Sequence, residues 1–219
     1  MSIRRVVIIG FGGFAREVAW LIREINQASN SPQFQLVGHV ISKLEPETRL
    51  EGGLLGDLSW LEKNRNQWDA LILGTGTPES RARLPRDLEK SLGPLDWPTL
   101  IHPNVLFDRK SSSIERGVLI CANVVGTVNL KIREFALINL SCTLGHESDI
   151  GAACVLNPSV NVSGGVEIGR ETLIGTGAQI LQVLKVGEGV SIGAGAVVTK
   201  DVASGQTVVG IPAKPLNIR

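Results

Sequence analysis

The chain lacks tyrosine altogether, and aromatic residues make up only 4% of its 219 positions. A hydrophobic core with so few rings must be built from valine, isoleucine and leucine. Cysteine is also scarce: Cys121, Cys142 and Cys154 are the three present, and no CxxC pair occurs. This excludes a disulfide framework and a cysteine-based zinc site, and it predicts packed, free thiols in a reducing cytoplasm.

Excess charge and long apolar runs are missing as well. The formal net charge is +1, with both signs scattered, so neither a nucleic-acid surface nor a polybasic membrane patch is expected. No run reaches the roughly 18 apolar residues that a membrane span requires. The opening MSIRRVVIIG is basic and then apolar, but its apolar run is too short for a signal peptide.

Residues 1–98 alternate between strand-like and helix-like segments. RRVVIIG, FQLVGHVI and DALILGTG are predicted to be buried strands, and PTLIH to be a short last strand. Helices are expected for FAREVAWLIREIN, for GDLSWLEKN with Asp57 as N-cap, and for PESRARLPRDLEKSL, which Pro85 should break. This order predicts an α/β domain with a short parallel sheet covered by helices.

From about residue 99 onward, an aliphatic residue recurs every six positions. The series is interrupted only by Gly126, and it consists of Ile114, Ile120, Ile132, Ile138, Leu144, Ile150, Leu156, Val162, Ile168, Ile174, Ile180, Val186, Ile192 and Val198. A period of six fits a solenoid in which each hexad makes one short strand and one corner. Glycine often follows the aliphatic residue, and we expect it to tolerate the backbone angles of the corner.

The hexads of residues 99–219 resemble the all-β, left-handed parallel β-helix of the hexapeptide-repeat acyltransferases. Three hexads there make one triangular coil, so eighteen residues return to the same corner about 4.8 Å further along. The whole chain is similar to one branch, the sugar O- and N-acetyltransferases related to sialic acid O-acetyltransferase and to nucleotide-aminosugar N-acetyltransferases. The matching segments are IIGFGGFAREV, LGDLSWL, IHP and INLSCTLGHESDIG. This resemblance implies a half-Rossmann domain in residues 1–98.

The segment GHE at positions 145–147 contains the chemistry of the solenoid. His146 occupies a corner, and Gly164, eighteen residues later, lies one coil along. An imidazole can take a proton from an attacking nucleophile, and an exposed backbone amide can hold the oxyanion that forms. Glu147 can fix the tautomer of the ring, and Asn139 can position the ring or the amine.

The resemblance assigns the same roles and adds a cofactor. It implies that His146 is the general base, that Glu147 and Asn139 assist it, and that the Gly164 amide binds the acetyl carbonyl. It further implies acetyl-CoA as co-substrate, held in the groove between subunits of a homotrimer. Cofactor-contacting positions of the family match Thr176 and Ala194, which are themselves eighteen residues apart, and Val155, where many relatives have a second histidine.

The glycine-rich turn after the first strand suits phosphate binding. Its loose GxGxxA pattern brings backbone N–H groups to a helix N-terminus, but no acid ends the second strand, so NAD is not expected. In the resembling family this turn contacts a sugar nucleotide, which implies substrate binding at Gly12, Gly13 and Phe14. Phe14 replaces the usual histidine, and acids are absent near positions 41 and 42, so the nucleotide (UDP, GDP or dTDP) stays open, as does a sugar without a nucleotide. The glycines could instead only form a tight turn.

Taken with the resemblance, these residues predict an acetyl-CoA-dependent N-acetyltransferase acting on a nucleotide-linked amino sugar, a 4-amino-4,6-dideoxyhexose, for surface polysaccharide or glycan synthesis. O-acetylation of a sugar hydroxyl, as in sialic acid modification, stays open, as does a non-catalytic sugar-nucleotide binding protein. A hexapeptide-repeat carbonic anhydrase would need three zinc histidines, but the repeat region offers only His146 and the junction residue His102. No metal is therefore expected.

Overall fold

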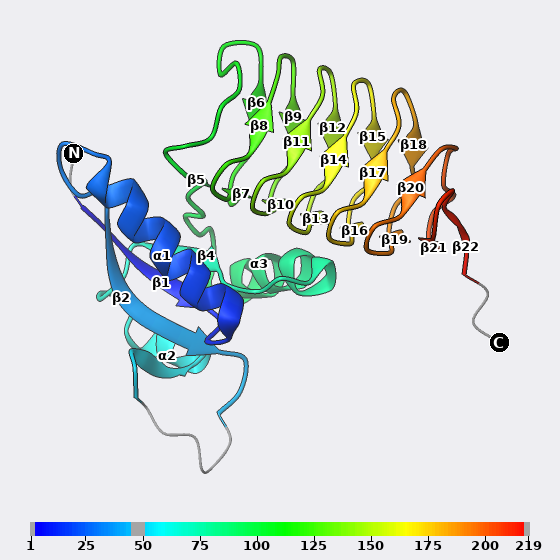
Figure 1. Cartoon of the computed structure of the whole chain (residues 1–219). Coiled ribbons are helices and arrows are strands. Elements are labelled where there is room, and N and C mark those ends of the chain that lie inside the picture. Colours follow the sequence, from blue (N-terminus) through cyan, green and yellow to red (C-terminus); the bar gives the residue numbers. More distant parts are fainter. Residues whose placement is uncertain (1–2, 45–50, 217–219) are drawn as a thin grey trace.

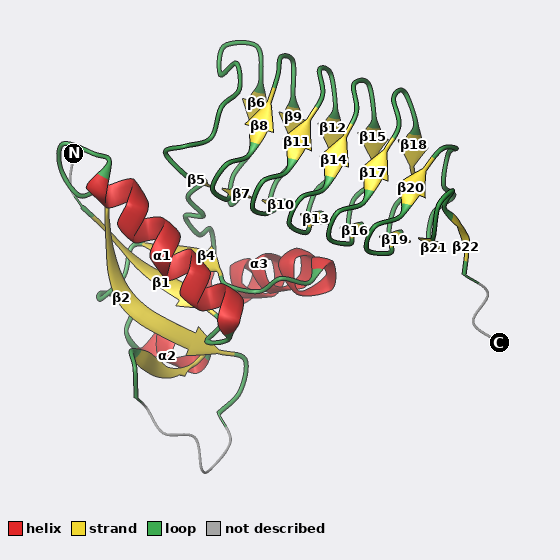
Figure 2. Ribbon diagram, viewed as in Figure 1, coloured by secondary structure: helices red, strands yellow, loops and turns green. Residues whose placement is uncertain are grey.

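A computed structural model describes residues 3–44 and 51–216. Its first part is built from alternating strands and helices (Figure 1, Figure 2). These are β1 (Arg4–Ile9), α1 (Gly13–Gln27), β2 (Phe34–Ile41), β3 (Leu54–Asp57), α2 (Ser59–Lys63), β4 (Ala70–Leu73) and α3 (Pro78–Leu92). Within the described residues the strands form one parallel sheet in the order β3-β2-β1-β4. The predicted α/β domain is confirmed.

The alternation of β1 explains how helices come to cover both faces of this sheet. Val6 and Ile8 belong to a buried cluster with the apolar stripe of α1. Val7 and Ile9 point to the other face, into a cluster with Leu61 of α2 and with Leu84 and Leu88 of α3. Successive side chains on a strand face opposite ways, so a continuous apolar run becomes buried on both sides.

Two local predictions differ from the structure. Asp57 does not cap α2: it ends the unpredicted strand β3, and its carboxylate accepts hydrogen bonds from the amide and hydroxyl of Ser59. The residue at the N-cap is Leu58. The expected break at Pro85 is also absent, because α3 runs unbroken past it. Leu84 and Pro85 are both buried, and we attribute the continuity of the helix to this packing, which offsets the lost backbone hydrogen bond.

The second part is a solenoid of short strands. After β5 (Leu100–Ile101), each hexad forms one two-residue strand: β6 (Ser113–Ile114), β7 (Leu119–Ile120), β8 (Val125–Gly126), β9 (Lys131–Ile132), β10 (Leu137–Ile138), β11 (Thr143–Leu144), β12 (Asp149–Ile150), β13 (Val155–Leu156), β14 (Asn161–Val162), β15 (Glu167–Ile168), β16 (Leu173–Ile174), β17 (Gln179–Ile180), β18 (Lys185–Val186), β19 (Ser191–Ile192) and β20 (Val197–Val198). The hairpin of β21 (Thr207–Val209) and β22 (Lys214–Pro215) follows. Strands pair in parallel with partners eighteen residues away, as predicted.

The three sheets of the solenoid have different outer surfaces. The domain-facing sheet (β5, β7, β10, β13, β16, β19, β21, β22) presents apolar side chains that pack into the α1 cluster. The uncharged sheet (β8, β11, β14, β17, β20) presents Val125, Thr143, Asn161, Gln179 and Val197. The charged sheet (β6, β9, β12, β15, β18) presents Ser113, Lys131, Asp149, Glu167 and Lys185. The residue before each inward-pointing aliphatic residue therefore determines whether the outer surface of a sheet is apolar, uncharged or charged.

The glycines that directly follow the aliphatic residues are needed at the corners for a different reason from the one predicted. The left-handed residue of each corner is the third after the aliphatic, and at many corners it is not glycine, as with Glu147 at φ 60°. The glycine directly after the aliphatic has no positive φ. A Cβ at Gly145 would lie 2.3 Å from the Gly164 nitrogen, in the backbone of the next coil. Close approach of neighbouring coils, not backbone angle, therefore requires glycine there.

The three thiols are free and buried, as expected. The Cys142 and Cys154 thiols donate to corner carbonyls of the next coil, at 3.2 Å and 3.0 Å. Burial raises the pKa of Cys121 and Cys154 to about 12 and that of Cys142 to about 11. They are packing residues rather than nucleophiles. No helix in the described part of the chain is long and apolar enough to cross a bilayer.

Candidate active site

His146 lies at the corner where β11 passes into β12. The corners that join the uncharged sheet to the charged sheet run along the edge of the solenoid that faces away from α1 and α3 (Figure 1). We call this edge the histidine edge. The His146 side chain is 62% exposed, so it projects from this edge and adds little to the core.

Gly164 lies directly beneath the imidazole, one coil along. A Cβ at Gly164 would be 2.4 Å from Nε2 and 2.5 Å from Cε1 of His146. The Gly165 amide donates to the His146 carbonyl at 2.8 Å, which fixes the two coils at this point. The predicted proximity of His146 and Gly164 is confirmed, and only glycine leaves room for the ring.

Glu147 orients the imidazole. Its Oε2 lies 3.0 Å from His146 Nδ1. The hydrogen bond from His146 is the main cause that lowers the pKa of Glu147, and a side-chain hydrogen bond from Asn129 lowers it further. An ionised carboxylate can only accept, so Nδ1 donates and a neutral ring has its lone pair on Nε2. Nε2 is therefore the atom that can take a proton, above Gly164.

The Gly164 amide is available for an oxyanion. Within the described residues no group accepts a hydrogen bond from this N–H, whereas the neighbouring Gly165 amide is paired. A backbone N–H beside a general base is the arrangement that acyl transfer uses to stabilise a tetrahedral intermediate. His146, Glu147 and Gly164 thus form one compact group on the histidine edge.

Asn139 is not part of that group. It lies at the opposite end of β11, at the corner between the domain-facing and uncharged sheets, which we call the domain edge. Its side chain is buried, and Oδ1 accepts from the Leu140 amide at 2.8 Å. Within one chain Asn139 therefore does not lie beside His146, because β11 separates the two corners, and its role in positioning the ring or the amine stays a prediction.

Thr176 and Ala194 also lie on the domain edge. They follow β16 and β19, and the Gly195 amide donates to the Thr176 carbonyl at 2.9 Å. Their predicted stacking in one corner column is confirmed, but the histidine edge is a different corner of the prism. A ligand that touches these residues and His146 must therefore bridge two corners.

Val155 does not fit its predicted contact with the acetyl donor. It is fully buried in the domain-facing sheet, in one cluster with Leu119, Leu137 and the apolar stripe of α1. A side chain with no exposed surface cannot touch a cofactor, so this prediction is wrong. The resemblance matched position 155 to a cofactor-contacting residue of the family, but in this chain the packing of the two domains buries a valine there.

The glycine turn between β1 and α1 is open. A Cβ at Gly12 would meet nothing within 4 Å, and Gly12 caps α1 without any side-chain hydrogen bond. Phe14 is half-buried and packs against the cluster between the domains.

Sequence reasoning missed a second glycine loop, residues 74–77, which approaches the first so closely that a Cβ at Gly10 would lie 2.7 Å from the Gly74 oxygen. The run GTGT after an apolar strand was its signal.

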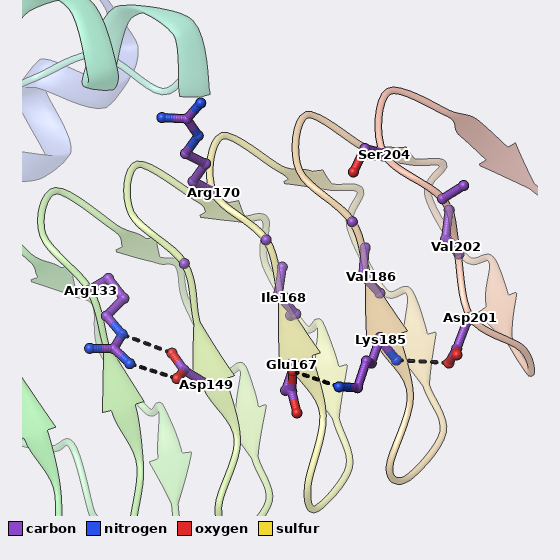
Figure 3. A pocket seen from close by; sticks show the side chains of 14 residues that line it. Arg133, Asp149, Glu167, Ile168, Arg170, Lys185, Val186, Asp201, Val202 and Ser204 are labelled. Atoms are coloured by element: carbon purple, nitrogen blue, oxygen red, sulfur yellow. Dashed lines mark hydrogen bonds and ion pairs between the residues drawn. The ribbon is translucent and has the colours of Figure 1, made fainter.

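A hollow of about 680 Å³ on the charged sheet holds none of the predicted site residues (Figure 3). Its charges pair with one another: Arg133 with Asp149 at 2.7 Å and Lys185 with Glu167 at 3.3 Å. Among the described residues no group of three or more potential ligands could hold a metal ion.

Comparison with known proteins agrees with this geometry. No protein-family model matches the chain, and no curated protein matches it. Among solved structures, a variant of perosamine N-acetyltransferase from Caulobacter crescentus, in complex with CoA and GDP-perosamine, is 28% identical, with 99% of each chain covered and a TM-score of 0.87. The acetyltransferase domain of PglB from Neisseria gonorrhoeae, in complex with acetyl coenzyme A, is 28% identical over 98% of this chain and 100% of its own, with a TM-score of 0.84.

A third solved structure has the highest identity of the three. WeeI from Acinetobacter baumannii is 30% identical over 96% of this chain and 99% of its own, with a TM-score of 0.78. These likenesses span both domains, so they include the half-Rossmann part as well as the left-handed β-helix. The chain belongs to the hexapeptide-repeat sugar N-acyltransferases.

Proposed function

We propose that this protein is an acetyl-CoA-dependent N-acetyltransferase whose acceptor is the amine of a nucleotide-linked sugar. The observation that carries the proposal is the arrangement of His146. Its Nδ1 is bound to Glu147, and its Nε2 lies above Gly164. Family membership supplies acetyl-CoA as donor, and the likeness to a structure holding CoA and GDP-perosamine supports an amino-sugar acceptor.

The geometry supports a direct transfer. The neutral sugar amine attacks the thioester carbonyl, and Nε2 of His146 takes the proton that the amine loses. The Gly164 N–H stabilises the negative oxygen of the tetrahedral intermediate. When the intermediate collapses, the C–S bond breaks and the imidazolium returns its proton to the departing thiolate. Glu147 stabilises the imidazolium while it exists.

The separation of the two edges supports a homotrimer with sites between subunits. Thr176 and Ala194 lie on the domain edge, whereas His146 lies on the histidine edge of the same chain. A neighbouring subunit that brings its histidine edge to the domain edge would join the two halves. The uncharged sheet connects these edges, and it exposes Val125 at 45% beside uncharged neighbours, which supports it as the contact surface.

We assign the acceptor to 4-amino-4,6-dideoxyhexoses linked to GDP, UDP or dTDP, in surface polysaccharide or glycan synthesis. The half-Rossmann domain is proposed to hold the nucleotide through Gly12, Gly13 and Phe14. The free thiols support a reducing cytoplasm as the location. A sugar hydroxyl would be served by the same base, so the acceptor panel must include one.

The test is a thiol-release assay with acetyl-CoA and a panel of GDP-, UDP- and dTDP-linked 4-amino sugars, with sialic acid as the hydroxyl acceptor. His146→Ala should lower kcat by about 10²- to 10⁴-fold with an unchanged melting temperature. Arg170→Ala is the matched control, since Arg170 holds the same hexad position at another corner. The proposal would be refuted if none of the acceptors caused thiol release, or if His146→Ala kept full activity.

A further inference from the structure

Arg81 is a buried cation without a buried anion. It lies in the first half of α3, is 0% exposed, and is among the largest fully buried side chains of the protein. In the part of the chain that the structure describes, no carboxylate pairs with its guanidinium. Burial lowers the pKa of Arg81 to about 9, so the group still carries its charge at neutral pH.

The contacts of Arg81 link the two domains. Nε donates to the Phe135 carbonyl, in a corner of the solenoid, at 2.7 Å. Nη1 donates to the Thr75 carbonyl, in the second glycine loop, at 3.0 Å. Nη2 is buried without a partner, and so is the Thr75 hydroxyl. A buried charge left uncompensated is strongly unfavourable, so a protein retains one where it serves a purpose.

The loop that Arg81 holds lies where nucleotides bind open parallel sheets. Strand β1 leads through α1 to β2 on one side, and β4 pairs with β1 on the other. The carboxyl ends of β1 and β4 therefore flank the point where the strand order reverses, which is the ligand crevice of such sheets. The loop at 74–77 and the turn at 10–13 come from these two strand ends and are in backbone contact.

The helix starts at this crevice are not equivalent. α3 has Thr77 as its cap, whose hydroxyl accepts from the Ser80 amide, and Glu79 in its first turn. α1 has no side-chain cap and no acid in its first turn. An anion is therefore favoured at the start of α1, beside the loop that Arg81 holds.

We propose that Arg81 is the positioning residue of the sugar-nucleotide site, holding residues 74–77 against the first glycine turn and supplying the positive charge that a bound diphosphate neutralises. It acts through the loop and does not touch the ligand. The same guanidinium fixes this loop to the solenoid. The diphosphate is therefore held in a fixed position relative to the solenoid that carries the histidine edge. This inference rests on the proposed nucleotide-sugar substrate.

Calorimetry with GDP, UDP and dTDP, and with the corresponding monophosphates, tests it on the full-length protein. Arg81→Met should weaken binding of the preferred diphosphate about tenfold or more and reduce its preference over the monophosphate. Arg81→Lys keeps the charge and should keep that preference. Arg116→Met is the matched control: Arg116 also links α3 to the solenoid, through Glu89 and Glu134, but away from the glycine loops.

Gly76 provides a second pair of variants in case Arg81→Met does not fold. Gly76 is exposed, and a Cβ there would meet nothing within 4 Å. Gly76→Asp should weaken diphosphate binding about tenfold, whereas Gly76→Asn, of the same size but neutral, should not.

A folded Arg81→Met with unchanged diphosphate affinity, or equal affinities of Gly76→Asp and Gly76→Asn, would overturn the inference while leaving acetyl transfer intact. If the unaltered protein binds no diphosphate yet releases CoA thiol with an acceptor, the inference fails alone; without thiol release, the proposed function fails too.

Discussion

Replacing Gly164 with alanine should remove activity without unfolding the protein. The added methyl would lie 2.4 Å from Nε2 and 2.5 Å from Cε1 of His146. Non-bonded heavy atoms need about 3.5 Å, so the ring must move by about 1 Å. The backbone of Gly164 has no positive φ, so alanine itself is not strained there.

The expected loss of kcat is about a hundredfold, because a displacement of about 1 Å in a catalytic group can reduce turnover by that factor. Stability should change by less than about 0.5 kcal/mol, since the His146 side chain is 62% exposed and can swing outward. Steady-state thiol release gives kcat, and thermal unfolding gives the stability change. KM for the sugar nucleotide should stay the same, because the glycine turns lie in the other domain.

Two other glycine-to-alanine changes serve as controls. At Gly145 the methyl would meet the backbone of the next coil at 2.3 Å, so Gly145→Ala should destabilise the protein by about 1–3 kcal/mol or more. Gly177 has φ 72° and open space around it, so its alanine variant should lose about 1 kcal/mol through backbone strain alone. If Gly164→Ala kept its turnover, or lost stability as Gly145→Ala does, the assignment of Gly164 would be refuted.

Further expectations concern Glu147, the trimer and the thiols. Glu147→Gln should lower kcat about 10- to 100-fold with no change in melting temperature, because it weakens the orientation of His146; an unchanged kcat would contradict this. Val125→Asp should yield monomers by light scattering and abolish turnover, whereas Lys131→Asp on the charged sheet should do neither. Burial raises the pKa of the three thiols to about 11 or 12, so unfolded thiols ionise first as pH rises. Urea unfolding should therefore show stability falling between pH 9 and 11, by up to about 1.4 kcal/mol per pH unit and thiol, and a flat profile would contradict it.

The repeat made most of the fold predictable. A hexad fixes an inward aliphatic and a corner, so the strand pairing at eighteen-residue spacing needs no information from outside the repeat. The same register alone predicts that His146 lies above Gly164. Strand β3 was not predictable in this way, because its four residues gain their pairing from β2. A short segment between glycines has no period that could reveal such a partner.

The site was harder to predict where domains or subunits meet. Val155 looked like a ligand position by resemblance, yet Leu119, Leu137 and Leu173, at eighteen-residue spacing from it, marked the column as apolar. That pattern indicates a covered face. The sequence also could not show why glycine follows each aliphatic, because the spacing is the same whether backbone angle or close approach demands it.

Because the two edges of one chain are separated, the proposal predicts that a single chain cannot form a complete active site. If every site combines the histidine edge of one subunit with the N-terminal domain of the next, two inactive variants can restore each other. His146→Ala damages one half. Gly12→Asp damages the other, because an aspartate at the cap of α1 suits the helix but repels a phosphate. Each subunit boundary joins unlike surfaces, so about a quarter of the boundaries in randomly mixed trimers combine two intact halves.

Co-expression of these two variants should therefore give about a quarter of the unaltered activity in the whole mixture and about a third in isolated mixed trimers, which each hold one intact boundary of three, although each variant alone is inactive. The matched control mixes His146→Ala with Gly164→Ala. Both changes damage the histidine edge, so no boundary in such trimers holds an intact site. Mixed trimers must be isolated by two different affinity tags before thiol release is measured. If they form and stay inactive in the first pairing, each site lies within one chain. The distance between His146 and the domain edge would then have to be closed by a conformational change rather than by a neighbour.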